Sequence, residues 1–390
     1  MARTAFASTY VPRRCGIATF TYDLATAVGN HEIVALHPAD ETGTYPSEVR
    51  HRVRRDYLAD YLMAARAINA DGVGTVSVQH EYGIWGGRDG EYVLDFVRAL
   101  NKPVISTLHT VLRNPTAHQR QLLVGLIRAS AASVVMSRSA AELLTRVYGV
   151  QPERLDVIPH GVPELPLVSS DSVKARLGIG GGPVILSFGL LGPGKGLETV
   201  VEAMPAVLSA IPNARYLIVG ATHPDLICHE GEAYRDGLKD RAIALGVADQ
   251  VQFVDRFVGK AELGDWLTAA DIFVTPYPNL EQIVSGTLAY AMSAGRAVVS
   301  TPYAYATELL GNGRGRLVEP GSPSALARSF VELLGNHDKR LTMGRLAYMY
   351  SRSMVWSQVG AQYRRLIERV TTPSVRREIE ETDAVAAFGA

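Results

Sequence analysis

Short apolar runs alternate with longer amphipathic stretches along almost the whole chain. Each apolar run is short enough for a buried strand, and the stretches between them have the pattern of surface helices. Such alternation is typical of parallel sheets covered by helices on both faces. In the N-terminal half, strands are expected at residues 4–8, 33–36, 75–79, 104–108, 132–136 and 155–158, and in the C-terminal half at 184–189, 214–219, 251–254, 272–275, 297–300 and 315–318.

A segment of different composition separates the two sets of strands. Residues 163–182 contain PELPLVSSDS and end on three consecutive glycines, which is typical of a linker, with a short helix expected at 172–177. The sequence therefore predicts an N-terminal domain over 1–165 and a C-terminal domain over 166–355. A last amphipathic helix, 356–370, and a charged, then apolar, tail complete the chain as 356–390.

Composition narrows the class of protein only a little. At 390 residues and 47% hydrophobic content the chain can bury a core in each half. Lys and Arg balance Asp and Glu at 39 each, so the net charge gives no reason to expect nucleic acid as a partner. Cys15 and Cys228 lack metal or redox spacing, which favours a reducing, cytoplasmic location. No apolar run of about 18 residues occurs, so no transmembrane segment is expected.

The segment after the strand at 272–275 carries the clearest chemical signal. Ser285, Gly286 and Thr287 open a helix there, and Glu281 precedes them by about one turn. The first N–H groups of a helix and its dipole attract an anion such as phosphate. A nearby carboxylate accepts hydrogen bonds from sugar hydroxyls. Phosphate together with a polyol describes an activated sugar.

A glycine-rich loop follows the strand at 184–189. It runs from Gly189 through Gly194 to Lys195 and leads into a helix, an arrangement that suits phosphate, although a lone glycine loop is a weak signal. Farther along, four residues of the kinds that bind metals lie close together, namely His223, His229, Glu230 and Glu232. Their spacing lacks the i, i+4 helical pair of a zinc site. We therefore expect no metal site here. We expect this segment to be a loop at the edge of the sugar- and phosphate-binding site.

Three loops in the N-terminal half end predicted strands. The first holds Arg13 and Gly16 and leads into a helix expected at 21–28, and Gly16 lets the backbone approach a ligand there; the alternative is an ordinary turn with solvated arginines. The second loop gathers polar and aromatic groups suited to an acceptor sugar, His80, Glu81, Tyr82 and Trp85, unless the tryptophan serves only packing. In the third, His109 follows a buried strand. It is either a histidine of the reactive site or a histidine of the core.

Taken together, the segment from Glu281 to Gly295, the Lys195-Gly196 loop and His109 resemble the retaining group-1 (family 4) glycosyltransferases. The resemblance covers roughly residues 4–370 and implies a GT-B fold, in which two Rossmann-like domains face each other across a cleft. It also implies that the last helix crosses back onto the N-terminal domain. The acceptor would bind to the N-terminal domain and a nucleotide-sugar donor to the C-terminal domain.

The sequence departs from this family at three positions. Two glutamates usually stand eight positions apart, but here Gln282 and Tyr290 occupy those positions, as a tyrosine also does in glycogen and starch synthases. The family's arginine five positions before the lysine is Leu190. Arg256, Arg13 and Arg14 are candidates to replace its guanidinium.

The resemblance implies a role for each candidate residue. Catalytic roles fall to His109, Glu281 and Lys195; donor binding to Gly16, Gly189, Gly194, Arg256, Gln282, Ser285, Gly286, Thr287 and Tyr290; and acceptor binding to Arg13, His80, Glu81, Tyr82 and Trp85. No metal and no tightly bound cofactor are expected, because the nucleoside diphosphate sugar is itself the substrate.

The function expected from this resemblance is retaining hexosyl transfer in polysaccharide biosynthesis. Mannose from GDP-mannose is the favoured donor, with glucose from UDP- or ADP-glucose next, and the acceptor is a hydroxyl of a saccharide or glycolipid. The Ser-Gly-Thr turn and the missing arginine keep a sugar phosphorylase using inorganic phosphate as an alternative. The altered glutamate pair leaves a non-catalytic sugar- or nucleotide-binding protein as another. The sequence leaves a homodimer open.

Overall fold

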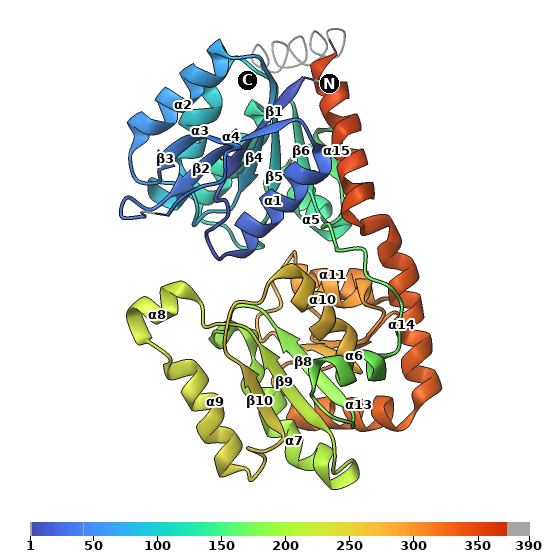
Figure 1. Cartoon of the computed structure of the whole chain (residues 1–390). Coiled ribbons are helices and arrows are strands. Elements are labelled where there is room, and N and C mark those ends of the chain that lie inside the picture. The colour runs from blue at the N-terminus through green and yellow to red at the C-terminus, as the bar shows by residue number, and fades with distance from the viewer. Residues whose placement is uncertain (1, 42, 373–390) are drawn as a thin grey trace. The chain divides into compact units, whose positions relative to one another are not determined.

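The computed structural model describes residues 2–41 and 43–372, which form two compact units. One unit is built from the chain up to Gly161 and from Trp356 onward, and the other from Val162–Val355. Each unit holds one parallel sheet with helices on both faces (Figure 1). The predicted α/β class with two Rossmann-like halves is confirmed.

The first unit contains a seven-stranded sheet in the order β3-β2-β1-β4-β5-β6-β7. Its strands are β1 (Arg3–Ser8), β2 (His31–His37), β3 (Val49–Arg54), β4 (Val73–His80), β5 (Val104–Leu108), β6 (Ala132–Val135) and β7 (Leu155–Val157). Its helices are α1 (Gly16–Val28), α2 (Leu58–Ala70), α3 (Tyr92–Ala99), α4 (Ala117–Ala129), α5 (Arg138–Leu143) and α15 (Trp356–Thr371), with short turns η1 (Arg88–Gly90), η2 (Leu144–Tyr148) and η3 (Pro152–Arg154). The strand order reverses between β1 and β4, and ligands of such sheets bind at that switch point.

The second unit contains a six-stranded sheet in the order β10-β9-β8-β11-β12-β13. Its strands are β8 (Val184–Phe188), β9 (Arg215–Val219), β10 (Val251–Val254), β11 (Ile272–Thr275), β12 (Ala297–Ser300) and β13 (Arg316–Leu317). Its helices are α6 (Ser170–Leu177), α7 (Leu197–Ala210), α8 (Pro224–Glu230), α9 (Ala233–Ala244), α10 (Lys260–Ala269), α11 (Gly286–Ser293), α12 (Ala304–Leu310), α13 (Pro323–Gly335) and α14 (His337–Ser351), with turns η4 (Pro193–Lys195) and η5 (Arg352–Met354). The switch point here lies between β8 and β11.

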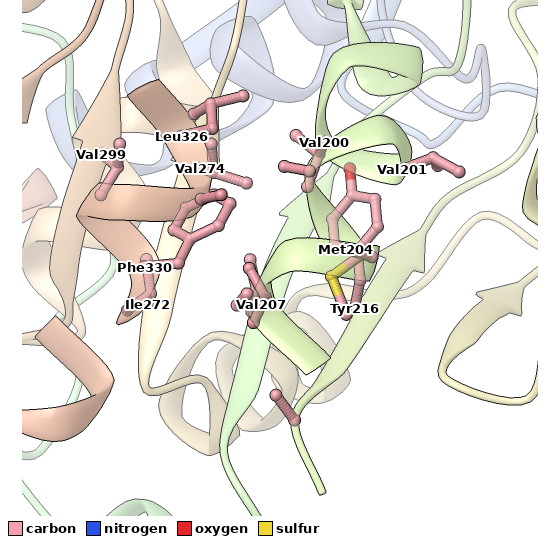
Figure 2. Packing of buried hydrophobic residues seen from close by; sticks show 14 of the residues in the cluster. Val200, Val201, Met204, Val207, Tyr216, Ile272, Val274, Val299, Leu326 and Phe330 are labelled. Carbon is pink, nitrogen blue, oxygen red and sulfur yellow. The ribbon is translucent and has the colours of Figure 1, made fainter. Parts of the chain in front are cut away.

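One face of the second sheet is sealed by α7 and α13. Figure 2 shows apolar side chains of both helices meeting those of the strands, namely Val200, Val201, Met204 and Val207 of α7, Leu326 and Phe330 of α13, and Tyr216, Ile272, Val274 and Val299 of the sheet. Such a covered sheet keeps its core dry. The loops beyond the carboxyl ends of the strands are then the places left for a ligand.

All strands expected from the apolar runs are present, with ends that differ by no more than two residues. The strand β3 was not expected. Its side chains alternate between an inner face with Val49 and Val53 and an exposed face with Arg50, Arg52 and Arg54, so it lacks the apolar run of a central strand. Its place at the edge of the sheet explains why it tolerates so many charges.

Two helices also differ from the expectation. Helix α1 begins at Gly16 rather than near Thr21, because the Cys15 sulfur caps it by accepting a hydrogen bond from the Ala18 N–H. The segment around Pro224 is the short helix α8, so the expected loop there is wrong. Within the described chain no helix has the length and hydropathy to cross a membrane.

Helix α15 packs against α1 within the first unit. A Cβ added at Gly360 would lie 2.5 Å from the carbonyl oxygen of Ala27, so α15 and α1 approach closely. The hydroxyls of Tyr363 and Thr107 are 3.0 Å apart, which ties α15 to the end of β5. The helix continues to Thr371, one residue into the expected tail, and residues 373–390 of that tail lie outside the described residues.

Candidate functional site

The glycine loop after β8 lies tightly against neighbouring loops of the second unit. Gly189 has φ +130°, and a Cβ there would lie 3.4 Å from the Thr287 side chain. Gly196 has φ +64°, and a Cβ there would come within 2.3 Å of the Pro276 carbonyl oxygen. Both positions need glycine for their positive φ, and Gly196 needs it for space as well. The loop is thereby held next to the end of β11 and the start of α11. A Cβ at Gly194, by contrast, would meet nothing within 4 Å.

A hollow opens between this loop and the end of β11. It is lined by Ser187, Phe188, Gly189, Leu190, Leu191, Lys195, Leu197, Val274, Thr275, Pro276 and Tyr277. The Lys195 ammonium lies 4.8 Å from the centre of the Tyr277 ring. Throughout the described chain, no carboxylate forms a salt bridge with Lys195. An ammonium that rests on an aromatic face without a carboxylate is available to bind an anion.

The start of α11 lies beside this lysine. The Ser285 hydroxyl caps the helix by accepting a hydrogen bond from the Leu288 N–H at 3.3 Å, and it also lies 3.0 Å from the Thr287 hydroxyl. The Thr287 hydroxyl is in turn 2.9 Å from the Tyr277 hydroxyl. The N–H groups of Gly286 and Thr287 have no carbonyl acceptor within the helix, as at any helix N-terminus. They are oriented to bind an anion at this end of the helix.

The structure therefore brings together five residues expected from the sequence, Gly189, Lys195, Ser285, Gly286 and Thr287. It joins them through Tyr277, which the sequence analysis did not identify. Tyr277 is 3% exposed and stacks on Tyr303, with ring centres 5.3 Å apart and planes 22° from parallel. The only sequence signal for it is a Pro-Tyr pair at the end of a buried strand.

Three other expected donor-site residues lie in or near the β11–α11 loop. The backbone N–H of Glu281 donates to the Asn279 side chain at 2.9 Å, and the Gln282 amide donates to the Val284 carbonyl at 2.9 Å. Gln282 thus braces the loop itself. The Tyr290 ring is half-buried, with its centre 6.3 Å from that of Phe188, a residue that lines the hollow.

Arg256 has a carboxylate partner. Its Nη1 donates to Glu262 Oε2 at 2.7 Å, and its Nη2 contacts Glu262 Oε1. Glu262 also accepts a hydrogen bond from the Trp266 indole at 3.0 Å. The hydrogen bonds from Arg256 hold the pKa of Glu262 below its usual value. Glu262 engages both Nη groups of Arg256 at an exposed position, and the assignment of Arg256 as the replacement for the missing arginine stays a prediction.

His109 is the central candidate of the first unit. Its Nε2 lies 3.0 Å from Gln79 Oε1, while the Gln79 amide nitrogen donates to Ser77. In this arrangement Nε2 carries the proton and Nδ1 is an acceptor. The Phe20 ring meets the imidazole edge to face at 4.8 Å. Burial, and next the neighbouring His160 and His80, lower the pKa of His109 to about 3, so the ring is neutral at ordinary pH.

The expected acceptor residues divide into two groups. His80 and Trp85 are 0% and 3% exposed; the Trp85 indole donates to the Gln79 carbonyl at 2.9 Å and its ring stacks on Tyr61. This supports the packing alternative for Trp85 and gives His80 no surface for an acceptor. The half-buried Glu81 accepts hydrogen bonds from the Thr110 hydroxyl and the Tyr82 N–H, and burial raises its pKa.

Thr110, in the loop after β5, was not assigned a role from the sequence. Because β4 and β5 pair in parallel, Glu81 and Thr110 follow neighbouring strand ends. Arg13 is half-buried in the loop after β1, where its N–H donates to the Tyr10 carbonyl, and Gly16 is exposed at the first position of α1. In residues 2–41 and 43–372, no group of three or more His, Cys, Asp or Glu side chains is arranged to hold a metal ion.

Two family models match the chain, one in each half. The family described as Glycosyltransferase Family 4 matches residues 15–164, and that described as Glycosyl transferases group 1 matches residues 182–336. The chain belongs to the group 1, family 4 glycosyltransferases. Both sheets and both candidate sites fall largely within the two matched regions.

Named relatives of this glycosyltransferase are similar over much of its length. A D-inositol 3-phosphate glycosyltransferase of Segniliparus rotundus is 27% identical over 72% of this chain and 63% of its own. A phosphatidyl-myo-inositol mannosyltransferase of Mycobacterium leprae is 26% identical over 73% of this chain and 71% of its own. The chain thus spans a little under two thirds of the inositol-phosphate relative.

Solved structures share the fold. Sucrose-phosphate synthase from Thermosynechococcus elongatus superimposes with a TM-score of 0.77 at 18% identity, covering 95% of this chain and 99% of its own. Anabaena HepE, in complex with UDP and glucose, gives a TM-score of 0.75 at 14% identity over 94% and 100%. The predicted GT-B class is confirmed by these neighbours.

Proposed function

We propose that this chain is a retaining hexosyltransferase that uses a nucleoside diphosphate sugar as donor. The observation that carries the proposal is the anion site of the second unit. Lys195 on the aromatic face of Tyr277 and the first N–H groups of α11 meet at the switch point of a Rossmann-like sheet. A diphosphate is the ligand that this combination of one cation and backbone donors fits best.

The proposed chemistry is a front-face displacement. The bond from the anomeric carbon to the diphosphate oxygen breaks while the acceptor oxygen bonds to the same face of that carbon, and the acceptor proton passes to the leaving oxygen. Lys195 and the α11 N–H groups stabilise the charge that develops on the diphosphate. The neutral His109, with Nδ1 as an acceptor, and Glu281 would bind hydroxyls of the donor sugar. Glu81 and Thr110 would bind the acceptor.

Several finer assignments belong to the proposal. Mannose from GDP-mannose stays the favoured donor, supported by the name of the Mycobacterium leprae relative, while the UDP complexes of HepE support UDP-glucose. The inositol-phosphate and phosphatidylinositol relatives support a polyol, saccharide or glycolipid hydroxyl as acceptor. The domain boundaries near 165 and 355, the cytoplasmic location and the homodimer stay predictions from the sequence.

A sugar phosphorylase is the second candidate. Leu190 stands where the family has an arginine, and Arg256 is bound to Glu262. With one cation fewer than the family's usual site, a single inorganic phosphate becomes the competing ligand. That reaction would release a sugar 1-phosphate.

One set of measurements separates these functions. Calorimetric titration with GDP, UDP, ADP and inorganic phosphate identifies the anion, and turnover is then followed with GDP-mannose, UDP-glucose and ADP-glucose. We expect tight binding of one nucleoside diphosphate and transfer with retained anomeric configuration, read by NMR of the product. Phosphate-dependent release of a sugar 1-phosphate would establish the phosphorylase instead. Nucleotide binding with no turnover of any donor would leave a binding protein.

A further inference from the structure

Tyr277 contacts both anion-binding groups of the second unit. Its ring supports the Lys195 ammonium at 4.8 Å, and its hydroxyl lies 2.9 Å from that of Thr287, the second residue of α11. The lysine belongs to the loop after β8, and α11 follows β11. A single aromatic residue therefore fixes the separation of two groups that lie far apart in sequence.

Tyr277 is itself held rigidly. Its ring stacks on Tyr303, which is fully buried and whose hydroxyl lies 3.3 Å from that of Thr275. The Tyr277 carbonyl accepts a hydrogen bond from the Thr301 hydroxyl at 2.7 Å. With both ring and backbone fixed, Tyr277 has little freedom to follow a mobile lysine. The lysine instead takes its position from the ring.

We propose that Tyr277 is the positioning residue that sets the span between Lys195 and the N-terminus of α11, and so makes the site selective for a diphosphate over a monophosphate. The inference rests on the proposed function and specifies how its donor site measures the ligand. Lys195 would bind one phosphate and the α11 N–H groups the other. Neither group alone distinguishes the two ligands, but a fixed separation between them does.

Two substitutions separate the contacts of Tyr277. Tyr277→Phe keeps the ring beneath Lys195 and removes only the hydrogen bond to Thr287, which should weaken nucleoside diphosphate binding about threefold. Tyr277→Leu removes the aromatic face as well, which should weaken it about tenfold or more. Binding of the corresponding monophosphate should change less than twofold in Tyr277→Phe and clearly less than diphosphate binding in Tyr277→Leu. Partial rescue by Phe marks an effect that acts through the lysine.

The decisive test repeats both substitutions in a Lys195→Met background. If Tyr277 acts by placing the ammonium, the difference between Phe and Leu at this position should disappear once the ammonium is gone. Tyr234→Phe is the matched control. Tyr234 lies on α9 of the same unit and does not line the hollow, and its hydroxyl donates a hydrogen bond of similar length, 2.8 Å, to Glu198. It should leave both affinities unchanged.

The measurement is calorimetric titration of the full chain with GDP, UDP and ADP and with their monophosphates. An equal loss of affinity for diphosphate and monophosphate would overturn the inference, as would a Phe–Leu difference that persists without Lys195. Diphosphate affinity within twofold of wild type in both variants would do the same, and Tyr277→Phe tests this even if Tyr277→Leu fails to fold. Wild-type protein that binds none of the nucleotides would overturn the proposed function, and the inference with it.

Discussion

Replacing Lys195 by methionine tests the donor site most directly. Methionine keeps an unbranched side chain of similar length over the Tyr277 ring and removes only the charge. At a separation of about 4 Å and an effective dielectric constant of about 20, an ammonium and a phosphate charge attract by about 4 kcal/mol. Lys195 is half-buried, so water screens part of this, and we expect a loss of about 2–4 kcal/mol of transition-state stabilisation.

That loss corresponds to a turnover rate lower by about 30- to 1,000-fold, since about 1.4 kcal/mol is a factor of ten. The fold should tolerate the change, because a cation–π contact that is partly open to water contributes about 1 kcal/mol. For a unit of this size, the melting temperature should then fall by no more than about 4 °C. Turnover is measured as release of nucleoside diphosphate from the donor that the titrations identify.

Lys239→Met is the matched control. Lys239 also lies over an aromatic ring of the second unit, 5.9 Å from the centre of Phe253, but it pairs with Asp236 and does not line the hollow. Its substitution should leave turnover unchanged. Turnover within threefold of wild type in Lys195→Met would refute the assignment of this lysine to the donor phosphates, because the charge would then contribute under about 1 kcal/mol.

Three further predictions concern stability and specificity. Gly196→Ala should lower the free energy of unfolding by more than about 2 kcal/mol in urea titration, because a Cβ there meets the Pro276 carbonyl at 2.3 Å and φ is +64°; Gly194→Ala, with open space around it, should be neutral. Burial lowers the pKa of His80 to about 4 from about 6.5, so the unfolded chain binds the extra proton below pH 6.5 and stability is lost as the pH falls toward 4. Wild type should lose about 2 kcal/mol more than His80→Asn between pH 7 and pH 5, and equal losses would contradict the burial of a neutral ring. Tyr290→Phe should keep nucleoside diphosphate affinity within about fivefold, whereas Tyr290→Glu, which places a partly buried carboxylate near the phosphates, should weaken it more. Reduced melting temperature with unchanged affinity in both variants would instead make Tyr290 a core residue only.

The sequence predicted those parts of the fold that depend on local apolar pattern. Central strands such as β5 and β11 are runs of buried residues, so their bounds follow from composition. The edge strand β3 shows only two valines among arginines and histidine, and nothing local distinguishes it from a charged loop. It becomes a strand by pairing with β2, a contact between separate segments that a local pattern does not show.

The candidate site divides in the same way. Lys195 and the Ser285 cap are local signals, a glycine loop and a helix start, and in the structure Thr287 and Tyr277 connect the two. Tyr277 could not be identified, because its role depends on a lysine more than eighty residues earlier in the chain. A sequence pattern likewise does not show that Trp85 stacks on Tyr61 or that Arg256 pairs with Glu262. These contacts determine which groups the two side chains bind.

The departures from the family pattern make physical sense as a set. In the proposed donor site, Leu190 would remove a cation and Tyr290 a carboxylate relative to the family pattern, while Gln282 stands at the other glutamate position with Glu281 one residue before it. A carboxylate near a diphosphate repels it, and an arginine offsets that repulsion. Losing both together leaves the net charge that faces the phosphates no more negative than in the usual site. One lysine, held on the Tyr277 ring and joined by the N-terminus of α11, can then serve where the family ordinarily uses an Arg–Lys pair.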